Sequence, residues 1–131
     1  MRLWLASNNT NKQHEIASVL KNITILYPSD TGIAFNPDET GSSFLENALI
    51  KANTLFDLVQ EPVVADDSGL CIDILNGKPD IFSSRYGIKD GVQMSYNERN
   101  ELLLQEIADA EKKSNYKRPR TAHLICAMAV K

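Results

Sequence analysis

The sequence lacks several features that would assign it to a familiar class. No run approaches the roughly 18 apolar residues that a membrane-spanning helix needs, so we expect no membrane-spanning segment. There is no internal repeat, no low-complexity segment, no glycine-rich phosphate-binding pattern, and no zinc, haem or dinucleotide signature. An excess of positive charge is also missing, because the net charge is −3. Phosphate polymers would be weakly repelled overall, and we expect no nucleic-acid partner.

Cysteine is scarce. Cys71 and Cys126 each lie in an apolar run, which predicts buried free thiols rather than a disulfide or a metal site. Free thiols fit a reducing compartment, so we expect a cytoplasmic protein. The apolar start of the chain, residues 1–6, is too short for a signal peptide.

The composition of the sequence is that of an ordinary globular protein. Its 131 residues are 43% hydrophobic and 24% charged, which predicts a single domain over residues 1–131. A strand at residues 3–6, a helix and a strand at 23–27 predict a parallel βαβ unit. Capping boxes predict further helices, one from Ser43 and Glu46 and one from Ser95 and Glu98. We therefore predict an α/β fold with a mixed, partly parallel central sheet flanked by helices.

Two adjacent carboxylates, Asp66 and Asp67, lie between the short strands predicted at residues 63–65 and 71–75. Strand ends in α/β sheets are common ligand sites, and paired acids there hold a divalent cation or move a proton. Successive strand residues point to opposite faces. Only one acid therefore faces a given site, and we expect the other to tie down backbone amides. The alternative is a simple turn, since Asp, Ser and Gly are favoured turn residues.

A polar turn separates the first strand from the first helix. Its residues are Ser7, Asn8, Asn9, Thr10, Asn11 and Lys12. Backbone N–H groups, the positive end of the helix dipole and the Lys12 ammonium would together attract phosphate. The alternative is a polar helix cap, in which Thr10 pairs with Gln13, beside a surface lysine.

A third polar group surrounds the second helix. Asn47 and Lys51 are four residues apart and share a helix face, so Lys51 could reach a ligand there. Glu46 is most simply the capping acid, whereas Glu39, in the preceding loop, is the better metal-ligand candidate. Together with the turn and the acidic pair, these groups suit a divalent cation that bridges acids and phosphates, and Mg²⁺ prefers such ligands.

The end of the chain combines a basic run with an apolar strand. The basic residues are Lys112, Lys113, Lys117, Arg118 and Arg120, which predict a solvated loop or, alternatively, an anion site. Residues 124–130 are all apolar and predict a strand buried on both faces. Further elements would normally cover such a strand, so we expect the domain to be incomplete at its C-terminal end.

Four segments follow one another in a recognisable order. They are Ser7-Asn8-Asn9-Thr10-Asn11-Lys12, Glu39-Thr40-Gly41-Ser42-Ser43-Phe44-Leu45-Glu46-Asn47-Ala48 with Lys51-Ala52, Ala65-Asp66-Asp67-Ser68-Gly69-Leu70, and Pro79-Asp80-Ile81-Phe82-Ser83-Ser84-Arg85-Tyr86. This pattern resembles the inosine/xanthosine triphosphate pyrophosphatases. The resemblance implies a two-lobed α/β fold and Mg²⁺-dependent hydrolysis of ITP, XTP and dITP to a monophosphate and pyrophosphate.

The resemblance also implies roles for individual residues. Carried over by position, residues 7–12 bind the triphosphate, Lys51 adds positive charge and Ser68 contacts the substrate. Asp67 is the general base and, with Glu39, a metal ligand. A carboxylate in this role takes the proton of a water that attacks the α-phosphorus. The partner is then a small nucleotide, and we expect a homodimer.

Members of that family continue beyond the point that corresponds to Lys131. The resemblance implies that the later aromatic-Gly-aromatic-Asp-Pro and Ser-His-Arg segments recognise the base. The alternative to an active enzyme is therefore an impaired relative that binds nucleotide weakly or dimerises. A second chain that supplies the missing part is a further possibility, because an exposed last strand invites pairing.

Overall fold

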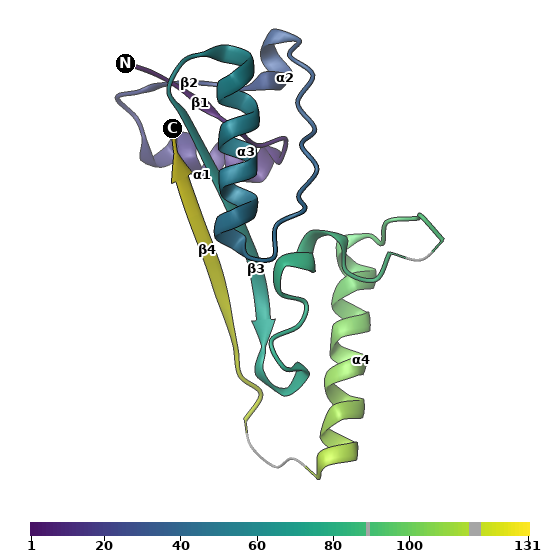
Figure 1. Ribbon diagram of the computed structural model, residues 1–131. Helices are drawn as coiled ribbons and strands as arrows, with labels where there is room; N and C mark the ends of the chain where they lie inside the picture. Colours follow the sequence, from purple (N-terminus) through teal and green to yellow (C-terminus); the bar gives the residue numbers. More distant parts are fainter. Residues whose placement is uncertain (89, 116–118) are drawn as a thin grey trace. The chain divides into compact units, whose positions relative to one another are not determined.

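The computed structural model describes residues 1–88, 90–115 and 119–131, which form two compact units. The first unit comprises residues 1–67 and 126–131, and the second comprises residues 68–125. The elements are β1 (Arg2–Leu5), α1 (Thr10–Val19), β2 (Thr24–Leu26), α2 (Pro28–Thr31), α3 (Phe44–Val59), β3 (Val63–Ile72), η1 (Asp73–Leu75), η2 (Asp80–Arg85), α4 (Tyr96–Ser114) and β4 (Ala122–Val130) (Figure 1). Among the described residues, no helix is long and apolar enough to cross a bilayer.

The strands of the described residues form one four-stranded sheet in the order β2-β1-β3-β4. β1 pairs in parallel with β2, with Leu3 opposite Ile25, and with β3, with Leu5 opposite Val64. β3 and β4 run antiparallel, because Val63 and Lys131 exchange both backbone hydrogen bonds, at 3.0 and 2.9 Å. This arrangement confirms the predicted βαβ unit and the predicted mixed, partly parallel sheet with flanking helices.

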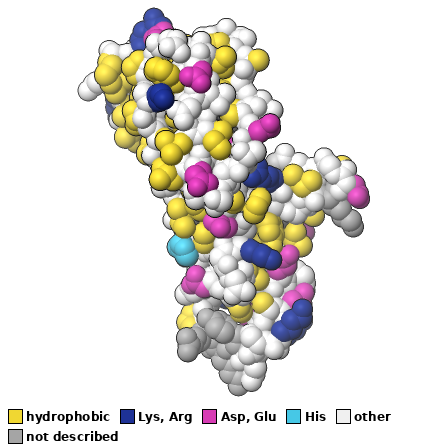
Figure 2. All heavy atoms as spheres, in the orientation of Figure 1, with side chains coloured by type: hydrophobic (Ala, Val, Ile, Leu, Met, Phe, Trp, Pro, Cys, Tyr) yellow, Lys and Arg dark blue, Asp and Glu magenta, His cyan; other side chains and the backbone are white. Residues whose placement is uncertain are grey.

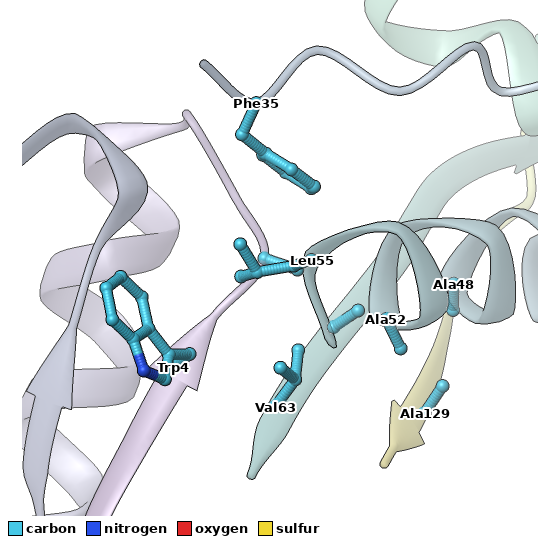
Figure 3. Packing of buried hydrophobic residues seen from close by; sticks show 9 residues of the cluster. Trp4, Phe35, Ala48, Ala52, Leu55, Val63 and Ala129 are labelled. Carbon is cyan, nitrogen blue, oxygen red and sulfur yellow. The ribbon is translucent and has the colours of Figure 1, made fainter. Parts of the chain in front are cut away.

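In the first unit, α1 and α3 cover opposite faces of the sheet. Odd-numbered residues of β3, such as Val63 and Ala65, pack against the α3 residues Ala48, Ala52 and Leu55 (Figure 3). On the other face, Val64 packs with Leu3, Leu5, Ile16 of α1 and Leu20, the residue that ends this helix. The alternation of side chains along β3 therefore sends Asp66 and Asp67 to opposite faces, as predicted.

β3 is one continuous strand, so the prediction of two short strands around an acidic turn is wrong. It runs from Val63 through Asp66 and Asp67 to Ile72. Local sequence favours a turn at Asp-Asp-Ser-Gly, but lysines distant in sequence pair with both carboxylates, Lys12 with Asp66 and Lys51 with Asp67. Burial of these acids in a strand is thus supported by tertiary ion pairs that no local pattern reveals.

The helix starts differ in detail from the predictions. Asn9, not Thr10, caps α1, because the Asn9 side chain accepts hydrogen bonds from the N–H groups of Asn11 and Lys12. Ser43 caps α3 as expected, but Glu46 accepts from the backbone N–H of Ser42 instead of completing the capping box. That bond, with a second from the Ser42 hydroxyl, lowers the pKa of Glu46. The segment after β2 also contains the short helix α2.

The second unit is built around α4. Ser95 and Glu98 form the predicted capping box at its start. Leu103 and Ile107 of α4 pack with Ile72 of β3 in a small apolar cluster. The segment between β3 and α4 also contains η2. Of the basic run, Lys117 and Arg118 lie outside the described residues, and Arg120 makes two hydrogen bonds to Glu111.

β4 is largely exposed, so the prediction of a strand buried on both faces is wrong. Ala129 is buried, but Leu124 is 79% exposed and Val130 is 75% exposed. Cys126 is exposed as well, whereas Cys71 is buried as predicted. β4 is an edge strand of the sheet, and Ala129 is its one residue in the core clusters of the described residues. Hydrophobic side chains are visible on the face drawn in Figure 2, interspersed with acidic and basic ones.

Candidate functional site

The candidate site lies where β1 ends and β3 continues. The last residue of β1, Leu5, is opposite Val64, and the Ala6 N–H still donates to the Val64 carbonyl at 2.8 Å. Asp66 and Asp67 follow on β3, next to the turn that leaves β1. Although the acids lie within β3, they therefore stand at the carboxyl end of the parallel part of the sheet. That edge is where open α/β sheets bind ligands.

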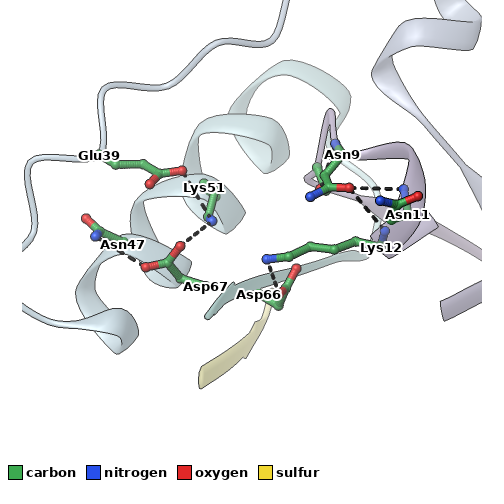
Figure 4. A network of polar contacts seen from close by, with 9 residues as sticks. Asn9, Asn11, Lys12, Glu39, Asn47, Lys51, Asp66 and Asp67 are labelled. Atoms are coloured by element: carbon green, nitrogen blue, oxygen red, sulfur yellow. Dashed lines mark hydrogen bonds and ion pairs between the residues drawn. The ribbon is translucent and has the colours of Figure 1, made fainter. Parts of the chain in front are cut away.

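On the α1 face, Lys12 and Asp66 form an ion pair (Figure 4). The Lys12 ammonium lies 2.5 Å from Asp66 Oδ2, and the Asp66 side chain is only 8% exposed. Asp66 was expected to tie down backbone amides, and instead it holds this lysine. Its other oxygen, Oδ1, is buried and has no hydrogen-bond partner among the described residues. An unsatisfied carboxylate oxygen is costly, so Asp66 depends on its pairing with Lys12.

On the α3 face, Lys51 joins two carboxylates (Figure 4). Its ammonium lies 2.9 Å from Asp67 Oδ1 and 3.3 Å from Glu39 Oε1. The Lys51 and Asp67 side chains are each 10% exposed, and Glu39 is 25% exposed. The structure thus brings Glu39, Lys51 and Asp67 together as the sequence suggested. Because the cluster is largely shielded from water, its charges interact more strongly than surface ion pairs do.

Asn47 is part of the same cluster, although the sequence did not single it out as a site residue. It is fully buried, and its amide connects the backbone N–H of Gly41 with Asp67 Oδ2, at 2.8 and 3.4 Å. The buried face of α3 contains Asn47 and Lys51 beside Ala48, Ala52 and Leu55, while the apolar residues Leu45 and Leu49 are exposed. A polar residue in a buried helix stripe needs partners, and here they are functional candidates.

The polar turn between β1 and α1 is organised by its own side chains. Ser7 Oγ accepts from the Asn9 N–H, and Asn9 in turn caps α1. The Asn8 amide donates to the Phe35 carbonyl at 2.7 Å. Thr10 and Asn11 are exposed at the first turn of the helix. The predicted phosphate attractors lie in this turn, but they have partners within the protein. The N–H groups of Asn11 and Lys12 donate to the Asn9 side chain, and the Lys12 ammonium pairs with Asp66.

Ser68 is the first residue of the second unit. It is half-buried on β3 directly after Asp67. Its contact with substrate stays a prediction, since the site described above is confined to the first unit.

A hollow of about 330 Å³ lies within the second unit and is separate from the charged cluster. It is lined mainly by apolar side chains of β3 and α4, including Leu70, Leu103 and Ile107. None of the predicted site residues lines it. The charge arrangement, and not the shape of this hollow, identifies the candidate site.

The fold and the cluster define an α/β protein with charged groups gathered at the carboxyl edge of a mostly parallel sheet. The chain belongs to the Ham1 family, whose profile matches residues 3–131. Among similar proteins, a dITP/XTP pyrophosphatase of Treponema denticola is 47% identical over 128 residues, which are 98% of this chain and 62% of that protein. One of Leptospira interrogans is 43% identical over 130 residues, covering 98% of this chain and 61% of that protein.

Solved structures agree with this assignment. A HAM1 protein from Coxiella burnetii superposes with a TM-score of 0.83 at 33% identity, covering 99% of this chain and 62% of that one. A nucleoside-triphosphatase, or dITP/XTP pyrophosphatase, from Mycobacterium abscessus gives a TM-score of 0.73 at 32% identity. The match covers 99% of this chain and 65% of that one. The chain therefore spans about three-fifths of the length of the relatives it matches.

Proposed function

We propose that this chain provides the phosphate- and metal-binding part of a nucleoside triphosphate pyrophosphatase. The substrates would be dITP, XTP and ITP, which would be cleaved to the monophosphate and pyrophosphate. The observation that carries this proposal is the convergence of Glu39, Lys51 and Asp67 beside the turn that holds Lys12. The names of the relatives, dITP/XTP pyrophosphatases, support the choice of substrate.

The cluster fits Mg²⁺. The Glu39 and Asp67 oxygens approach one cationic nitrogen, that of Lys51, so two carboxylates already converge on one point of positive charge. Mg²⁺ in nucleotide enzymes is typically held by one or two carboxylates together with phosphates and waters. Among the described residues, no group of three or more His, Cys, Asp or Glu side chains forms an all-protein metal cage, which is compatible with such an open site. We assign Glu39 and Asp67 as the ligands.

The residues of the chain divide the chemistry between them. The helix N-terminus and Lys12 would hold the triphosphate, since N–H groups and an ammonium both attract phosphate oxygens. Mg²⁺, when bound, would supply positive charge that neutralises the phosphates and activates water. Asp67 would take a proton from the attacking water, which adds to the α-phosphorus while the bond to the bridging oxygen breaks and pyrophosphate leaves. Lys51 would neutralise charge that develops on the phosphates.

The direct test is to incubate the 131-residue chain with Mg²⁺ and dITP, XTP or ITP and to measure pyrophosphate release. We expect release that is lost in Asp67→Asn, a variant that keeps the side-chain shape but cannot accept the proton. dATP and dGTP serve as the control substrates. If the parent releases no pyrophosphate while both proteins bind nucleotide equally, the chain is the impaired relative and not an active enzyme.

We also propose that the chain forms a homodimer and acts in the cytoplasm. The exposed apolar residues of the edge strand β4, among them Leu124 and Met128, support self-association, because unpaired strand edges and apolar patches favour association. The free thiols and a soluble nucleotide substrate support the location.

A further inference from the structure

The amide of Asn47 has a fixed orientation. The Gly41 backbone N–H can only donate, so it must face Asn47 Oδ1, which it reaches at 2.8 Å. The Asn47 nitrogen then points toward Asp67 Oδ2, 3.4 Å away, where a carboxylate can only accept. Each end of the amide therefore has one compatible partner. Exchanging its oxygen and nitrogen would oppose donor to donor and acceptor to acceptor.

The absence of a side chain at Gly41 leaves space for the Asn47 amide. A Cβ atom at this position would lie 2.6 Å from Asn47 Oδ1 and 2.7 Å from Glu46 Cβ, closer than real Cβ contacts. Glycine is needed here because the backbone approaches α3 closely. A left-handed backbone conformation is not the reason, since the φ of Gly41 lies outside that region. The contact therefore joins the segment that carries Glu39, two residues earlier, to the buried face of α3.

The two carboxylate oxygens of Asp67 have different partners. Its Oδ1 faces the Lys51 ammonium at 2.9 Å, and its Oδ2 faces Asn47. Lys51 is a cation and would compete with any other cation at Oδ1. Asn47 is neutral and fully buried, so its hydrogen bond holds the carboxylate without contributing positive charge.

From these contacts we propose that Asn47 is a positioning residue. Its amide fixes the Asp67 carboxylate and the Glu39-bearing segment relative to one another, so that Asp67 Oδ1 and Glu39 converge on one cation-binding point. This inference rests on the proposed roles of Glu39 and Asp67 as metal ligands. Groups that orient metal ligands in this way typically contribute about 10- to 100-fold to metal affinity.

The test is to titrate the nucleotide-free chain with Mn²⁺ and to count the free ion by electron paramagnetic resonance. Asn47→Leu keeps the side-chain size but removes both hydrogen bonds, and we expect Mn²⁺ binding about 10- to 100-fold weaker than in the parent. Asn53→Leu, the same change at an exposed position of α3, is the matched control and should bind like the parent. Binding of metal-free dITP in the presence of a chelator should not change in either variant.

A second variant tests the inference in case Asn47→Leu does not fold. Gly41→Ala leaves Asn47 in place but pushes the Glu39-bearing segment away from it, so it should also weaken Mn²⁺ binding. Folded variants, judged by the fluorescence of Trp4, that bind Mn²⁺ like the parent would overturn the inference, and so would a parent that binds no Mn²⁺. Pyrophosphate release is scored separately. A parent whose Mn²⁺ binding depends on Asn47 but which hydrolyses nothing would refute the proposed function and leave this inference standing.

Discussion

Replacing Lys51 with methionine should destabilise the metal-free protein and make Mg²⁺ stabilise it more than it stabilises the parent. Lys51 lies 2.9 Å from Asp67 and 3.3 Å from Glu39 in a largely buried cluster. Removing one partner of a buried ion pair typically costs about 3–5 kcal/mol, because the remaining charge is left uncompensated. Asp67 keeps its hydrogen bond from Asn47, so we expect the lower end of that range, about 3 kcal/mol.

The assay is urea unfolding followed by the fluorescence of Trp4. This residue is the single tryptophan of the sequence and is buried in the core that α3 covers. In a chelator, Lys51→Met should lose about 3 kcal/mol of unfolding free energy. Excess Mg²⁺ should return part of that loss, since a ligand at about 100 times its Kd adds about 2.7 kcal/mol to the folded state.

The control is Lys21→Met, the same substitution at an exposed lysine of the first unit, which should leave stability within about 0.5 kcal/mol of the parent. The reasoning is refuted if Lys51→Met is as stable as the parent in a chelator. It is also refuted if Mg²⁺ stabilises the parent more than the variant, because Lys51 would then not occupy the cation position between the two acids.

Three further predictions concern other parts of the chain. Ser95→Ala should lower the unfolding free energy by about 1 kcal/mol through loss of the α4 cap, with Ser95→Thr near the parent; equal stability of the alanine variant would contradict this. Burial and the bond to Glu106 raise the pKa of Tyr86 to about 12. The stabilisation that the protonated Tyr86 hydroxyl gives the folded state is therefore present below about pH 10 and lost as pH rises from about 10 to about 12. Tyr86→Phe should remove the last phase of a tyrosinate absorbance titration. Persistence of that phase would refute the assignment. Leu124→Lys with Met128→Lys should shift the size-exclusion mass from dimer to monomer, and an unchanged dimer would place the interface elsewhere.

Local patterns in the sequence were sufficient for the parts of the fold that local forces decide. The parallel β1-α1-β2 unit follows from hydrophobic periodicity, and the caps of α3 and α4 follow from Ser43 and Ser95. The opposed directions of Asp66 and Asp67 follow from strand geometry alone. These features need no knowledge of distant contacts.

The errors arose where distant contacts override local preference. Asp-Asp-Ser-Gly favours a turn, yet Lys12 and Lys51, 54 and 16 residues away from their respective partners, allow the acids to be buried within β3. The apolar run at β4 indicated a buried strand, but burial depends on position in the sheet, and β4 is at the edge. Strand order is a property of the whole sheet, and hydrophobicity of one segment does not reveal it.

The candidate site was also predictable only in part from the sequence. The sequence placed Glu39, Lys51 and Asp67 in neighbouring motifs, and the structure brings them together. The link from Asn47 to Asp67 could be recognised only after the buried face of α3 was known. Hydrophobicity alone does not define that face, since Leu45 and Leu49 on the same helix are exposed.

The proposed function requires that Asp67 take the proton of a water that attacks the α-phosphorus of a nucleoside triphosphate. The most direct measurement is hydrolysis of dITP in ¹⁸O-labelled water with Mg²⁺, with both products analysed by mass spectrometry. We expect label in the monophosphate, unlabelled pyrophosphate, and loss of both products in Asp67→Asn. Label in pyrophosphate, or unchanged turnover by the variant, would contradict it.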